Sequence, residues 1–80
     1  MISIEYKVLD QRVLPDEIEM NLDAEGLSVL LSELKLLVDG RTDHVHLMSE
    51  AWGGTHLDDQ PRNQGFASIH HMKILLREEL

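Results

Sequence analysis

The chain of 80 residues has no cysteine. A disulfide framework and a cysteine-based zinc site are therefore excluded, and a reducing cytosol is the simplest compartment. No apolar run approaches the roughly 18 residues that a membrane span needs, and the first five residues carry no basic segment typical of a signal peptide. We expect a soluble cytoplasmic protein without a membrane partner.

The sequence also lacks the local signatures of common enzymes. It has no Gly-rich phosphate loop, no nucleophile-elbow pattern and no His-Glu-x-x-His on a helix. A chain of this length buries only about 60 to 65% of its unfolded surface, so a large internal active site would compete with the core. We expect no enzymatic activity and no cofactor.

Positive charge is scarce, because 7 Lys and Arg stand against 15 Asp and Glu and give a net charge of −8. Such a surface repels phosphate backbones, so nucleic acid is not an expected partner. A basic protein partner would be steered toward it. A simpler interpretation is that the charge keeps a small domain soluble, and the charge alone does not choose between the two.

Apolar and polar residues alternate at about 2–9 and 17–22, as in strands with one buried face. Turn residues lie between the two runs, at 10–12 and 15–16, so a hairpin is predicted. A helix is predicted at about 24–38, with Asp23 as its N-cap and Gly40 after its last turn. One helical face carries Leu27, Leu30, Leu31, Leu34, Leu37 and Val38. We interpret this stripe as the side facing the domain's own core, with a dimer seam as the alternative.

Two further strands are predicted at about 44–49 and 68–77, and the loop between them, 50–66, is long enough to be functional or disordered. The ββαββ order predicts one α+β domain over residues 1–80. Its architecture is a single four-stranded, mainly antiparallel sheet with one helix packed on one face.

The sheet face opposite the helix is predicted to be open and polar. His44 and His46 are two apart on a strand and so share a face, and His71 joins them only if the last two strands pair in a suitable register. The other expected members of this face are Glu5, Lys7, Glu17, Glu19, Asn21 and Lys73.

Three imidazoles and a water could form a zinc site with Zn–N distances of about 2.0 to 2.1 Å. His44, His46 and His71 are the candidate ligands in that alternative, a histidine-rich metal-binding domain. We prefer the interpretation without metal, in which the three rings pack, form hydrogen bonds or contact a partner.

The loop begins with Trp52-Gly53-Gly54, which has two interpretations. Trp52 could fold back as a plug over the sheet edge, with the glycines in a tight turn. It could instead anchor an interface, flanked by the acidic residues Glu50, Asp58 and Asp59. The sequence does not separate the two, and we prefer the plug.

The order of a leucine-rich helix, His-Val-His-Leu-Met at 44–48, Trp-Gly-Gly at 52–54 and Ile-His-His-Met-Lys-Ile at 69–74 resembles the immunity protein family 32 of bacterial polymorphic toxin systems. The resemblance covers roughly residues 17–76, although the stretch 58–64 matches no pattern. It implies a small cytoplasmic protein that neutralises a cognate toxin by stoichiometric occlusion, without catalysis and without naming the toxin.

The predicted partner-binding surface has Trp52, His44, His46 and His71 at its centre. Glu50, Asp58 and Asp59 would steer a toxin that has a basic surface. The alternatives are the metal-binding domain and a small homodimeric structural module that pairs through an exposed edge strand. A homodimer is compatible with the immunity interpretation as well.

Overall fold

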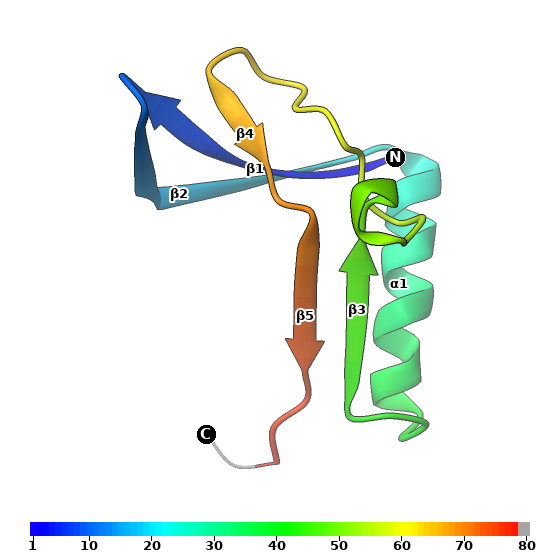
Figure 1. Ribbon diagram of the computed structural model, residues 1–80. Helices are drawn as coiled ribbons and strands as arrows, with labels where there is room; N and C mark the ends of the chain where they lie inside the picture. The colour runs from blue at the N-terminus through cyan, green and yellow to red at the C-terminus, as the bar shows by residue number, and fades with distance from the viewer. Residues whose placement is uncertain (79–80) are drawn as a thin grey trace.

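The computed structural model describes residues 1–78 and the side chains of these residues other than 14–16. Along the chain the elements are β1 (Ile2–Leu9), β2 (Arg12–Leu22), α1 (Ala24–Val38), β3 (His44–Met48), the short 3-10 helix η1 (Glu50–Trp52), β4 (Phe66–Ser68) and β5 (His71–Leu75). Figure 1 shows the β1–β2 hairpin lying across one end of α1 and of the upright β3–β5 pair. The predicted α+β class, with one α-helix and antiparallel strands, is confirmed.

The strands are divided between two sheets rather than gathered in one. The first sheet has the order β2-β1-β4 and the second pairs β3 with β5, all antiparallel. The division arises because the predicted strand 68–77 is bent. Its first part pairs with β1, the Ile69 N–H donates to the Ile4 carbonyl at 2.7 Å, and the chain then turns to pair with β3. A strand that changes sheets in this way makes a corner between them.

The second strand is longer than predicted, because the hairpin turn contains only Asp10 and Gln11, both with positive φ. The other expected turn, at 15–16, is an irregularity inside β2. Tyr6 pairs with Ile18, but the next residue of β1, Lys7, pairs with Leu14. Pro15 lies in this irregular stretch. Proline has no N–H to donate to the ladder, and strands tolerate it at bulges and on sheet edges.

The helix has the predicted limits, because both of its ends are capped by local interactions. The Gly26 N–H donates to the Asp23 carboxylate at 2.7 Å. At the other end Gly40, with a φ of 70°, and Arg41 donate their N–H groups to the carbonyls of Leu37 and Leu36. This pair of bonds is the Schellman motif.

The core lies where the hairpin meets α1 and the β3–β5 sheet. Its buried members are Ile2 and Ile4 of β1, Leu47 of β3 and Leu57 of the loop, and partly buried side chains from α1 and β5 pack against them. The predicted leucine stripe is only partly in this core, because Leu30 packs there and Leu37 is buried while Leu27, Leu31 and Val38 are exposed.

The first half of β1, Ile2–Glu5, is buried on both faces, which contradicts the expected open position of Glu5. The Glu5 side chain is 0% exposed and accepts hydrogen bonds from five donors. Backbone N–H groups of Arg62 and Asn63 donate at 2.8 and 3.1 Å, and the other donors are Ser3 Oγ, Asn21 Nδ2 and Asn63 Nδ2. The loop that follows η1 therefore closes over this face of β1.

Desolvation by itself would raise the pKa of Glu5, but the hydrogen bonds from Ser3, Arg62 and Asn63 outweigh it, so its pKa is lowered from 4.5. The folded state thus favours the carboxylate. Its contribution to stability is present above pH 4.5 and is lost as the pH falls through the lower folded-state pKa.

We expect Glu5→Gln to reduce the free energy of unfolding by about 2 to 4 kcal/mol, because an amide nitrogen would then face the loop's donors in a buried site. Urea unfolding at neutral pH measures the loss, and hydrogen exchange should show reduced protection of the Arg62 and Asn63 amides. The control is Glu17→Gln, at an exposed position of β2. Equal losses in the two variants would contradict the anchoring role.

Candidate functional site

The register of the second sheet gathers the predicted histidines on one face. His46 pairs with Lys73, Met48 with His71 and His44 with Leu75, and paired residues point to the same side of an antiparallel sheet. The opposite face carries the apolar partners Val45, Leu47, Met72 and Ile74, which point toward the core. The register therefore places His71 on the same face as His44 and His46.

The rings on this face form a continuous row, which we call the ring row: Trp52, His71, His46 and His44. The His46 and His71 rings stack with centroids 5.0 Å apart, and His46 Nδ1 is hydrogen-bonded to His71 Nε2 at 2.8 Å. The His44 ring meets His46 edge-on at 5.1 Å. At the other end the indole of Trp52 is tilted against His71 at 5.7 Å.

The tryptophan is not the predicted plug. Its side chain is 59% exposed, and it packs on His71 rather than over the core. The reason is that η1 turns the chain outward directly after β3, with Trp52 at its end. The apolar side chain that this loop contributes to the core is instead Leu57, which is buried there and whose backbone forms a bridge with Ser49.

The two glycines after Trp52 hold this turn for different reasons. Gly53 ends η1 with a φ of 83°, a conformation that favours glycine. At Gly54 the backbone passes so close to Met48 that a Cβ would lie 2.4 Å from the Met48 carbonyl oxygen. A side chain at either position would displace η1 and with it Trp52.

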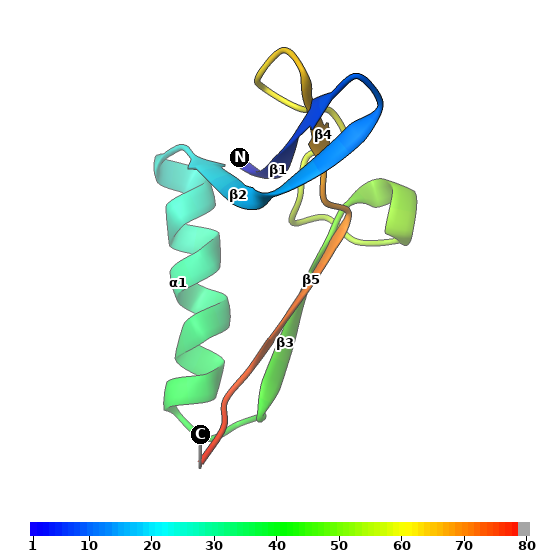
Figure 2. The same cartoon turned by 90° about the vertical axis from the view of Figure 1, so that its left-hand side faces the viewer.

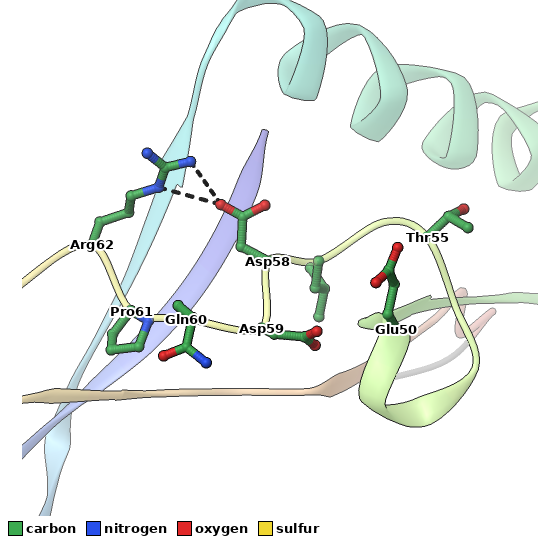
Figure 3. A pocket seen from close by; sticks show the side chains of 8 residues that line it. Glu50, Thr55, Asp58, Asp59, Gln60, Pro61 and Arg62 are labelled. Atoms are coloured by element: carbon green, nitrogen blue, oxygen red, sulfur yellow. Dashed lines mark hydrogen bonds and ion pairs between the residues drawn. The ribbon is translucent and has the colours of Figure 1, made fainter.

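The three acidic residues predicted to steer a partner, Glu50, Asp58 and Asp59, line one open hollow of about 470 Å³. Glu50 enters it from η1, and Asp58 and Asp59 enter it from the loop (Figure 3). The other lining residues are Thr55, Leu57, Gln60, Pro61 and Arg62. Glu50 and Trp52 both belong to η1, so this short helix connects the hollow with the ring row along the chain.

The three carboxylates of the hollow differ in how strongly they are already paired within the protein. Arg62 donates to Asp58 from Nε and Nη2 at 3.2 and 2.8 Å, so this carboxylate is already paired. Asp59 accepts a longer bond, 3.3 Å, from the Ala51 N–H, and its carboxylate lies 3.7 Å from His70 Nδ1. Glu50 and Asp59 therefore provide most of the free negative charge.

Sequence reasoning missed two residues that hold this region together. Ser49 is fully buried, and its Oγ lies 2.8 Å from His70 Nδ1, while its N–H donates to the His70 carbonyl. The grouping of Ser49, His70 and Asp59 does not have the geometry of a catalytic triad, because both partners face the same ring nitrogen. These contacts fasten β3 to the start of β5.

The metal alternative finds little support in the geometry. Within residues 1–78, no group of three or more His, Asp or Glu side chains is arranged to hold a metal ion. The 2.8 Å hydrogen bond directs His46 Nδ1 and His71 Nε2 at each other rather than at a common third point.

The pKa of His46 is lowered from its ordinary value, first by desolvation and then by repulsion from His71, His44 and Lys73. At the outer end of the row, the hydrogen bond from His44 Nδ1 lowers the pKa of Asp43. His46 therefore favours the neutral imidazole. In its hydrogen bond with His71, one ring nitrogen donates and the other accepts.

Comparison of the chain with protein-family models, with curated proteins and with solved structures finds no match. The resemblance to the immunity family therefore stays a prediction. Among the helices that the structure describes, none combines the length and the apolarity needed to cross a membrane.

We expect His46 to titrate below pH 6.5 in the folded protein, because folding disfavours its protonated form. Its contribution to stability is complete above pH 6.5 and is lost as the pH falls through the folded-state pKa. NMR titration of the imidazole Cε1–H resonances measures this. In His71→Ala the pKa of His46 should rise, because both desolvation and repulsion decrease. An unchanged value in that variant would contradict the coupling.

Proposed function

We propose that this chain is a small protein-binding module that neutralises a cognate bacterial toxin by covering part of its surface, as its resemblance to immunity proteins implies. The observation that carries the proposal is the junction of the exposed Trp52, at one end of the ring row, with the acidic hollow through η1. The complex would form in the cytoplasm and would need no turnover.

The ring row is well suited to be the centre of an interface. Tryptophan is enriched among residues that dominate binding free energies, and its indole is here presented on a support of stacked imidazoles. Burying Trp52 and His71 costs little desolvation as long as the rings are neutral. A flat, partly apolar surface with hydrogen-bonding edges is typical of protein recognition.

The acidic hollow gives the proposed interface its negative charge. Glu50 and Asp59 stand at its wall without a lysine or arginine partner among the described side chains, although Asp59 lies 3.7 Å from His70 Nδ1. They therefore attract a basic surface during approach. Such charges act mainly on the association rate. A toxin with lysine or arginine opposite the hollow fits both parts of the site.

The direct test is co-expression with a toxin encoded beside this chain in its genome. The proposal expects restored growth and a 1:1 complex by isothermal titration calorimetry. Native mass spectrometry with added zinc tests the rival interpretation. A stoichiometric zinc adduct that is lost in His46→Ala, together with absence of growth protection, would contradict the proposal.

Trp52→Ala should weaken the complex at least about 30-fold, corresponding to roughly 2 kcal/mol, mainly through faster dissociation. The matched control is Leu76→Ala, which removes another exposed apolar side chain after the end of β5. Surface plasmon resonance measures both rate constants. Equal effects of the two substitutions would exclude Trp52 as an anchor.

The double variant Glu50→Gln/Asp59→Asn should slow association and flatten its dependence on salt, with little change in dissociation. As a control, Glu17→Gln/Glu25→Gln makes the same change in net charge, from −8 to −6, at exposed positions of β2 and α1. If both variants slow association equally, the steering comes from total charge and not from the hollow.

A further inference from the structure

One side of α1 remains uncovered although it is apolar. Leu27, Leu31 and Val38 are 46, 57 and 82% exposed. With Ala24 and the half-buried Leu34 they recur at alternating steps of three and four residues, which is the spacing of a coiled-coil seam. We call these five residues the α1 seam.

The seam is distinct from the side of α1 that serves the core. Gly26 and Leu37 are buried and Leu30 packs against the core cluster, so these residues mark the inward face. Because successive residues are about 100° apart on a helix, the seam lies roughly a quarter of a turn from that face. The single predicted stripe is therefore two stripes, and this chain covers only one of them.

The molecule as a whole exposes more surface than a folded monomer of its size. A monomer of 9.2 kDa is expected to expose about 4,900 Å², whereas this chain exposes 5929 Å². The excess, roughly 1,000 Å², is comparable to the ~800 Å² that each partner contributes to a stable interface. The radius of gyration, 13.7 Å against about 11.6 Å expected, agrees.

The hairpin that precedes α1 carries a second exposed apolar surface. Ile18 and Met20 of β2 lie on the same face as Ile4, because Met20 pairs with Ile4 and Ile18 with Tyr6. α1 follows β2 directly and packs on this face only near Ile2 and Ile4, which leaves Ile18 60% exposed. Figure 2 shows the hairpin extending beyond the helix.

The seam also avoids the repulsion that a net charge of −8 would otherwise create between two copies. The stretch from Leu27 to Ser32 has no charged residue. Glu25 and Glu33 flank this stretch in the sequence, but at 100° per residue they lie about 140° away from the seam around the helix. Lys35 and Asp39, which lie closer to the seam, form an ion pair with each other at 3.1 Å. A second copy of the same helix therefore meets an uncharged surface that is complementary to its own.

We propose that the protein is a homodimer in which the α1 seam of one protomer packs against the α1 seam of the other across a two-fold axis. A two-fold axis uses the same patch on both copies, as the seam requires. The ring row lies on the opposite face of the β3–β5 sheet from α1, so both copies of the proposed partner-binding surface remain free. The dimer would be bivalent, and its formation does not depend on the proposed function.

Sedimentation equilibrium over micromolar concentrations tests the dimer. The wild-type protein should have twice the 9.2 kDa mass of one chain. Leu31→Glu, at the middle of the seam, should halve that mass while leaving the circular dichroism spectrum unchanged, because the exposed side chain contributes little to the monomer's own core. The matched control is Ser32→Glu, which adds the same charge at the next, exposed position and should remain dimeric.

A wild-type protein that is monomeric throughout the concentration range would overturn the proposal. A Leu31→Glu protein that is folded and still dimeric would also overturn it, because the dimer would then use another surface. A monomeric Leu31→Glu variant that still binds the toxin with unchanged site affinity would support the dimer and its independence from the ring row.

Discussion

The buried carboxylate of Glu5 is the interaction on which the presentation of the site depends. A carboxylate without solvent requires donors for its oxygens, and here most of them come from the loop at Arg62 and Asn63. These bonds place the loop on β1 and thereby position Asp58 and Asp59, which stand just before it in the chain. Without this anchor, the acidic hollow would lose one wall.

The second sheet has a different role, since it separates the ring row from the core. Strand alternation directs Val45 and Leu47 to the core and the neighbouring histidines to the outside, where Trp52 extends the row. The short helix η1 then joins the row to the hollow. The proposed binding surface spans a sheet face and an anchored loop, which is a more rigid arrangement than a loop alone, and rigidity reduces the entropic cost of association.

Sequence reasoning succeeded where the determining interactions are local. The limits of α1 follow from Asp23 at one end and Gly40 at the other, so both could be predicted from neighbouring residues. The shared face of His44 and His46 follows from strand periodicity alone. It failed for the burial of Glu5 and the exposure of Trp52, because both depend on where residues more than fifty positions apart or on different elements come to lie.

The sequence by itself determined the α+β class, the helix and the alternation of β3, because each is encoded in short-range patterns. It also determined the acidic net charge, which follows from the composition. Only the tertiary structure decided that 66–75 serves two sheets, that His71 reaches His46, and that the acidic residues of the loop share a hollow. It also decided which leucines of α1 enter the core. The reason is that register and burial depend on the simultaneous packing of distant segments, which periodicity does not specify.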